Sequence, residues 1–279
     1  MIPPIASKFV AGESAAGALD HARQMNEDGV AVILNLLGEH YHERGPADED
    51  ADAYIQLVED IASSDLDACV SVKPSQIGLD VGDDVFVENY RRIAAAADDH
   101  GVFLWCDMED HETTDVTLDA FEELAREFGG GMGLCVQANL KRTPDDLERL
   151  ADVPGKIRLV KGAYDEPASI AHKKKSKIDE VYKELLAYLF REYEGGIAVG
   201  SHDPEMIDYA RELSAEYDRD YEIQMLMGVR EDAQRELAAE GIEVWQYAPY
   251  GGKWFSYFYR RVRERKENAL FALRAVVGI

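Results

Sequence analysis

The chain has 279 residues, of which 55 are Asp or Glu and 30 are Lys or Arg, so its formal net charge is −25 at pH 7. An acid excess of this size argues against nucleic acid as a partner and against tight electrostatic docking on an anionic membrane, because phosphates would be repelled. Hydrophobic residues nevertheless make up 46% of the chain, which is enough apolar material for a folded core.

Short apolar runs recur along the chain with the length and composition of strands buried on both faces. We expect eight strands, within the runs 31–39, 68–78, 101–110, 131–139, 156–164, 196–203, 221–229 and 243–251. Segments with helical spacing lie between them, among them 52–63, 117–128 and 178–193. Thr143-Pro144 and Asp203-Pro204 are suitable caps at the starts of two further helices.

Strands that alternate with helices predict right-handed crossovers and a parallel sheet. Eight such units in about 250 residues favour an α/β fold of the closed (β/α)8 TIM barrel type, formed by one domain over residues 1–279. An open doubly wound sheet is the alternative, but no G-x-G-x-x-G follows the first strand. A last helix is expected from about Trp254, lying over the active site.

Almost every predicted strand has a polar or charged residue near its C-terminal end, where the active site of a barrel lies. Burying such a group without a partner costs ~1–3 kcal/mol, so a purely structural barrel has little reason to carry a ring of them. Each one taken singly could cap a helix or bond a neighbouring strand, whereas the full set favours a shared ligand. The set is Glu39, Lys73, Asp107, Gln137, Arg158, Lys161, Ser201, His202, Asp203, Gln224 and Tyr247.

Three residues of this set, Lys73, Arg158 and Lys161, are positive in an otherwise acidic chain. Positive charge at a barrel mouth predicts an anionic ligand such as a phosphate or carboxylate. Gly162 and Ala163 would let the backbone approach that ligand closely, and the helix start near residue 203 offers backbone N–H groups. A ligand as large as a dinucleotide cofactor is consistent with this pattern.

Two other barrel chemistries have weaker support. His40 and His42 lie beyond the first predicted strand rather than within it, unlike the ligands of a metal-dependent hydrolase, so we expect no metal. A Schiff base on Lys73 or Lys161 is an alternative, although either lysine could equally pair with a carboxylate or with an anionic ligand.

Cys69, Cys106 and Cys135 each lie in an apolar run without the paired spacing of a zinc site, so we expect buried, reduced thiols. The N-terminal residues lack a secretory pattern, and no apolar window approaches ~18 residues. We therefore expect a cytoplasmic protein with at most peripheral membrane contact. The lysine-rich stretch 173–177 is interpreted as a solvated helix face rather than a nucleic-acid site.

Acidic residues outnumber basic ones along most of the chain, for example in DEDADA at 48–53. Self-repulsion of this kind destabilises a protein in dilute salt and keeps it soluble in concentrated salt. We interpret the acidity as that of a salt-adapted archaeon or bacterium, and an ordinary acidic enzyme is the alternative.

The segment after the last predicted strand contains Y-x-x-R-R-x-x-E, which places Tyr257, Arg261 and Glu264 on one helical face. An exposed helix with weak ion pairs is one interpretation, and an arginine pair that holds a carboxylate is the other. Together with R-L-V-K-G-A-Y (158–164), E-I-Q-M-L-M-G (222–228) and Y-A-P-Y-G (247–251), this segment resembles proline dehydrogenase, a family of flavin-dependent (β/α)8 barrels. The resemblance covers nearly the whole chain.

The resemblance implies a role for each matching residue. Asp107 and Arg158 would be catalytic, Asp107 by ordering the active site and Arg158 by lying near the flavin N5. FAD would be bound by Met108, Gln137, Arg158, Lys161, Gly162, Ala163, Ser201, His202 and Gln224. Proline would be bound by Lys73, Leu226, Tyr247, Tyr257, Arg260 and Arg261, with Glu264 holding the arginines.

The implied reaction is hydride transfer from C5 of L-proline to FAD, which gives 1-pyrroline-5-carboxylate and begins proline degradation. A quinone or another respiratory-chain carrier would reoxidise the flavin. The chain lacks the extra domains of bifunctional proline-catabolic enzymes, so the product would pass to a separate 1-pyrroline-5-carboxylate dehydrogenase. The alternatives are another FAD barrel such as methylenetetrahydrofolate reductase, and an inactive barrel that serves as a binding protein.

Overall fold

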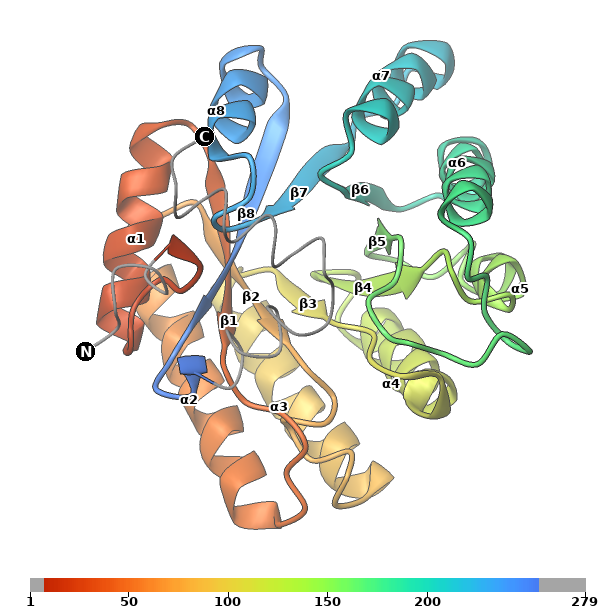
Figure 1. Ribbon diagram of the computed structural model, residues 1–279. Coiled ribbons are helices and arrows are strands. Elements are labelled where there is room, and N and C mark those ends of the chain that lie inside the picture. The colour runs from red at the N-terminus through yellow and green to blue at the C-terminus, as the bar shows by residue number, and fades with distance from the viewer. Residues whose placement is uncertain (1–7, 256–279) are drawn as a thin grey trace.

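The computed structural model describes residues 8–255, which form a closed barrel of parallel strands surrounded by helices (Figure 1). The strands follow one another around the barrel in chain order, and pairing of the first with the last closes it. The predicted (β/α)8 barrel is therefore confirmed. The strands are β1 Ala31–Leu36, β2 Ala68–Val72, β3 Leu104–Cys106, β4 Met132–Gln137, β5 Lys156–Val160, β6 Gly196–Gly200, β7 Glu222–Leu226 and β8 Glu243–Tyr250.

The helices lie outside the strands (Figure 1). Their buried apolar residues pack in one cluster with those of the strands. They are α1 Ala15–Glu27, α2 Arg44–Ala62, α3 Asp83–His100, the 3-10 turn η2 His111–Thr113, α4 Thr114–Glu127, α5 Thr143–Arg149, α6 Lys175–Glu192, α7 Pro204–Tyr217 and α8 Glu231–Ala239. Helical backbone begins again at Trp254, as predicted, and residues 256–279 lie outside the described part of the chain.

Two details of the predicted helices differ from the structure. Helix α2 starts well before residue 52, because Ala47 and Ala51 are buried on its inner face. Of the acids between them, Glu49 is exposed, whereas Asp50 accepts a hydrogen bond from the buried Gln76 amide at 2.8 Å. The prediction that Thr143 caps a helix is wrong: α5 already includes Thr143, whose hydroxyl donates instead to the Gln137 carbonyl at 2.6 Å. Asp203 caps α7 as predicted, by accepting from the Glu205 N–H at 3.2 Å.

The strands are shorter than the apolar runs that predicted them. Only Leu104–Cys106 of the run 101–110 pairs with neighbouring strands, for example. The C-terminal part of most runs belongs to the loop that follows the strand, and Lys73, Asp107 and Lys161 all lie in such loops. These loops place polar residues at one end of the barrel.

Alternate residues of the strands enter two different hydrophobic clusters, as the two-residue period of a strand requires. Most apolar residues pack between the strands and the helices, whereas a small cluster of Ile33, Cys69, Trp105 and Ala198 lies on the opposite, interior face. A Cβ at Gly133 would lie 2.5 Å from the Trp105 ring, so this glycine makes room for an indole inside the barrel. The interior is therefore only partly filled by apolar side chains.

The cysteines agree with the prediction, since Cys69, Cys106 and Cys135 are buried and free.

Within residues 8–255, no group of three or more His, Cys, Asp or Glu side chains is arranged to hold a metal ion. No helix of the same described part is long and apolar enough to cross a membrane.

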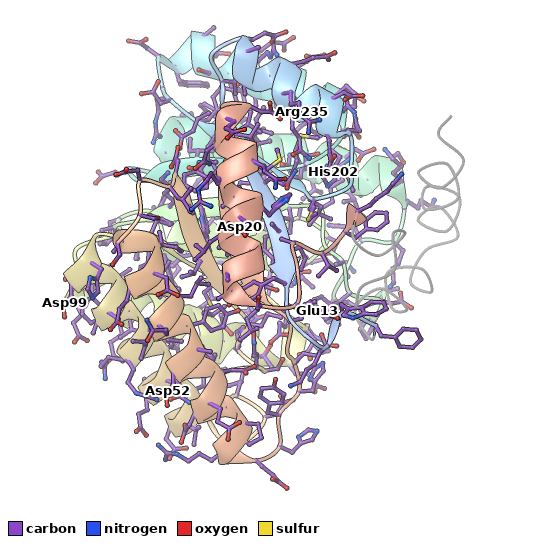
Figure 2. All side chains as sticks on the ribbon, turned by 90° about the vertical axis from the view of Figure 1, so that its left-hand side faces the viewer. Glu13, Asp20, Asp52, Asp99, His202 and Arg235 are labelled. Atoms are coloured by element: carbon purple, nitrogen blue, oxygen red, sulfur yellow. The ribbon has the colours of Figure 1, made fainter. Side chains whose placement is uncertain are left out.

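Acidic side chains cover the outer surface of the first helices. Figure 2 shows Glu13 just before α1, with Asp20 on α1, Asp52 on α2 and Asp99 on α3, all exposed. Some acids have basic neighbours, such as Asp20 with Arg23 at 2.8 Å, but exposed pairs contribute only about 0–1 kcal/mol each. Pairing one acid with one base leaves the net charge of −25 unchanged, so the excess carboxylates repel one another.

We expect the midpoint of thermal unfolding to rise as KCl increases from about 0.1 M to about 1 M, because the Debye length falls from about 10 Å to about 3 Å and screens the self-repulsion. Differential scanning fluorimetry at constant pH measures the midpoint. A sucrose series is the control, since sucrose strengthens apolar burial without screening charge. A midpoint that is constant or falls over this KCl range would contradict salt adaptation.

Candidate active site

A cavity of about 470 Å³ opens at the C-terminal ends of the strands. Every predicted site residue within the described part of the chain lines it, with the exception of Ser201. The lining residues from that prediction are Lys73, Asp107, Met108, Gln137, Arg158, Lys161, Gly162, Ala163, His202, Gln224, Leu226 and Tyr247. Tyr257, Arg260, Arg261 and Glu264 lie outside the described residues.

Arg158 on β5 is buried on the wall of the cavity, with 5% of its side chain exposed. Its Nη2 donates to Asp107 Oδ1 and its Nη1 donates to Gln224 Oε1 at 3.0 Å. The guanidinium carbon lies 4.9 Å from the centre of the Trp105 ring and 5.7 Å from that of Tyr247, distances typical of cation–π contacts. Burial lowers the pKa of Arg158, but the charge of Asp107 outweighs it and the pKa is raised, so the group stays protonated.

Asp107, which follows β3, connects three neighbouring side chains. Besides its ion pair with Arg158, it accepts from Ser71 Oγ at 2.9 Å and from the Tyr247 hydroxyl at 2.7 Å. Burial and the charge of Asp107 raise the pKa of Tyr247 well above its ordinary value. The hydroxyl of Tyr247 therefore keeps its proton and acts as a donor toward the carboxylate.

Lys73 stands at the end of β2, with its Nζ 3.6 Å from Glu39 Oε2. Behind it, the buried carboxylate of Glu109 accepts from the Ser75 N–H at 2.6 Å and from Ser75 Oγ at 2.8 Å. Burial raises the pKa of Glu109, although Lys73 and the Ser75 hydrogen bonds lower it. The Gln137 amide donates to the Glu109 carbonyl at 2.8 Å, so Glu109 connects the loops after β2 and β3 to the end of β4.

Lys161 and Gly162 begin the loop after β5. Lys161 Nζ pairs with Asp179 of α6 and lies 2.8 Å from Asp203 at the start of α7. Gly162 has φ +105°, and a Cβ there would lie 2.1 Å from Asn139 Oδ1, so a residue without a side chain is required at this turn. The lysine expected to face an anionic ligand is thus also held by two carboxylates.

His202 contributes to the cavity, while Ser201 lies beside it. The Leu226 N–H donates to His202 Nε2 at 3.3 Å, which assigns the proton of a neutral imidazole to Nδ1. The Ser201 hydroxyl accepts from the Asp203 N–H at 3.1 Å and so supports the start of α7. The role of Ser201 in cofactor binding stays a prediction.

Sequence reasoning missed several residues that hold the site together, namely Ser71, Trp105, Cys135 and Glu222. Each lies two positions before a residue that was predicted, such as Trp105 before Asp107 and Glu222 before Gln224. Residues two apart on a strand face the same side of the sheet. The period of the strands was therefore the signal that could have found them.

Comparison with known proteins shows one family. The family model "Proline dehydrogenase" matches residues 18–274. A curated proline dehydrogenase of Deinococcus radiodurans is 39% identical over 98% of this chain and 90% of its own length. Proline dehydrogenase 1 of Bacillus subtilis is 34% identical, with the same coverage of both chains.

Similar solved structures support the fold. Proline utilization A from Bdellovibrio bacteriovorus, inactivated by N-propargylglycine, superimposes with a TM-score of 0.87 at 22% identity, over 95% of this chain and 33% of that one. Proline utilization A from Corynebacterium freiburgense gives a TM-score of 0.79 at 24% identity, over 98% of this chain and 32% of that one. The chain thus spans about a third of those longer proteins.

The ion pair inside the barrel predicts a graded effect of two substitutions on stability. Asp107→Asn leaves the buried guanidinium without a charged partner and should lower the free energy of unfolding by about 3 kcal/mol. Tyr247→Phe removes one hydrogen bond to the same carboxylate and should cost about 1 kcal/mol. Urea unfolding followed by tryptophan fluorescence measures both, and equal losses in the two variants would contradict the ion pair.

Proposed function

The chain belongs to the proline dehydrogenase family, and we propose that it oxidises L-proline to 1-pyrroline-5-carboxylate by hydride transfer to FAD, as the first step of proline degradation. The supporting observation is that residues from β2 to β8, matched separately to FAD and proline by sequence, meet on the wall of one cavity. The complete set of polar residues at the strand ends also argues against an inactive barrel. The alternative of a methylenetetrahydrofolate reductase is not supported, since the matching family model is that of proline dehydrogenase.

The residues of the cavity fit FAD. Lys73, Arg158 and Lys161 provide cationic donors suited to an anionic cofactor. At Gly162, where a Cβ would clash with Asn139, the bare backbone can approach a bound group closely. Met108 and Leu226 add apolar wall next to these charges, as in most cofactor sites.

FAD supplies the hydride acceptor when it is bound. Arg158, held by Asp107 and Gln224, presents a fixed positive charge to the site, which favours negative charge that develops there during reduction. Tyr247 supplies an aromatic wall. Arg260 and Arg261, which lie outside the described residues, would bind the proline carboxylate and so orient the carbon that gives up hydride.

The electron acceptor and the next enzyme are further parts of this proposal. A quinone or another respiratory-chain carrier reoxidises the flavin. The protein acts in the cytoplasm, with at most peripheral membrane contact. The curated "Bifunctional protein PutA" of Escherichia coli matches only 56% of this chain and 14% of its own length. We propose that residues 1–279 form one domain and that a separate 1-pyrroline-5-carboxylate dehydrogenase receives the product.

Flavin absorbance tests the proposed reaction directly. The purified protein should be yellow, and L-proline should bleach its flavin band under anaerobic conditions, because the substrate reduces the bound FAD. NADH is the control, since a folate-reducing barrel of the rival class would be bleached by NADH instead. A colourless protein that gains no activity with added FAD would refute the proposal.

Substitution of an arginine in the last segment tests the carboxylate site. Arg261→Met should raise KM for L-proline about 10- to 100-fold, because it removes a charge-assisted hydrogen bond worth about 1.5–3 kcal/mol. Flavin content should not change. Arg263→Met is the matched control, since the helix that the sequence predicts from about Trp254 would place residue 263 on a different face from residue 261. An unchanged KM in Arg261→Met would show that this arginine does not bind proline.

A further inference from the structure

A chain of polar side chains runs through the interior of the barrel behind Arg158. Lys156 at the start of β5 donates to Glu222 Oε2 at the start of β7. Glu222 Oε1 accepts from Gln224 Nε2 at 2.5 Å, and Gln224 Oε1 accepts from Arg158 Nη1 at 3.0 Å. Glu222 does not line the cavity, and its hydrogen bond with Gln224 links it to the site.

The strand between β5 and β7 leaves room for this chain. Lys156 and Arg158 pair in register with Gly196 and Ala198 of β6, and Glu222 pairs with the same Ala198 from the other side. A Cβ at Gly196 would lie 2.6 Å from Lys156 Cγ. The small residues of β6 therefore let long side chains of β5 and β7 meet above them.

The side-chain amide of Gln224 has a donor end and an acceptor end, and its two partners assign them. Arg158 has only donors, so it must face the oxygen of the amide. The carboxylate of Glu222 has only acceptors when ionised, so it must face the NH2 group. Both Glu222 and Gln224 are buried, and a reversed amide would leave two mismatched contacts that water cannot relieve.

Lys156 provides the positive partner of the ionised Glu222 carboxylate that this arrangement needs. Burial has the larger effect and raises the pKa of Glu222, and the charge and hydrogen bond of Lys156 limit that rise. The lysine is 31% exposed and reaches the N-terminal end of the barrel, whereas the carboxylate is 3% exposed. The Lys156–Glu222 ion pair therefore connects a partly exposed ammonium group to the buried amide of Gln224.

We propose that Glu222 is a positioning residue for the oxidation of proline: it fixes the orientation of the Gln224 amide and thereby holds the guanidinium of Arg158 against the flavin. This inference rests on the proposed function. Removing a nearby negative charge by itself would make the reduction potential of the flavin more positive. Releasing Arg158 has the opposite sign, because the reduced flavin loses a fixed positive charge.

Glu222→Gln tests the inference, because the new amide can donate to Gln224 Oε1 and turn its NH2 group toward Arg158. The midpoint potential of bound FAD, measured with a chemical reductant and a reference dye, should become more negative. With L-proline, kcat should fall about tenfold, as for the loss of one charged hydrogen bond, while KM changes less than threefold. Asp146→Asn is the matched control: this buried carboxylate on α5 pairs with Arg142, which directly precedes the helix, and the variant should leave the potential unchanged.

A double variant separates positioning from direct charge effects. In a Gln224→Met background the link is absent, so Glu222→Gln should produce no further negative shift. If Glu222→Gln does not fold, Glu222→Asp keeps the charge but shortens the reach to Gln224, and it should also lower the potential. A positive or absent shift in the folded variant overturns the inference.

The potential is measured without proline, so it separates the two proposals. A wild-type protein that binds FAD but is not reduced by proline refutes the proposed substrate, while the shift in the variants still decides whether Glu222 positions Arg158. A wild-type protein that takes up no FAD overturns both.

Discussion

A guanidinium buried inside a β-barrel is the constraint on which the rest of the site depends. Arg158 carries five N–H donors and a permanent charge, and leaving such a group without partners would cost several kcal/mol. Its acceptors come from opposite parts of the sheet, with Asp107 after β3 and Gln224 on β7. Trp105 and Tyr247 cover it with aromatic faces. Each of these neighbours is then itself held, Asp107 by Ser71 and Gln224 by Glu222.

Space inside the barrel limits which strands can supply these partners. Gly133 leaves room for the Trp105 indole, and the small residues of β6 let side chains of β5 and β7 meet. Larger residues at these positions would occupy the space that the indole and the long polar side chains now fill. The glycines of β4 and β6 thus have a role in the chemistry even though they carry no functional group.

Charge is organised differently on the outside and inside of the molecule. The surface is acidic, with exposed carboxylates along the outer helices (Figure 2). At the cavity, Arg158 and Lys161 each have carboxylate partners at hydrogen-bonding distance, and Lys73 lies 3.6 Å from Glu39. These pairs hold the cations in place before any ligand arrives, so a bound anion meets a preorganised site rather than mobile side chains. The net charge of the surface determines how stability responds to salt, whereas the cations of the cavity determine which kind of ligand can bind.

The sequence by itself determined the succession of strands and helices, the family, and the residues at the cavity, because each of these depends on local periodicity or on short motifs such as R-L-V-K-G-A-Y. It overestimated strand length, since apolar composition continues into loops where pairing has stopped. It also missed the roles of Trp105, which lies in no quoted motif, and of Glu222, which begins the motif E-I-Q-M-L-M-G but was not singled out within it. Only the tertiary structure decided that Asp107, Arg158 and Gln224 share one hydrogen-bonded chain. Their contacts join positions 51 and 66 residues apart, and such pairs form only when barrel closure brings distant strands face to face across a common interior.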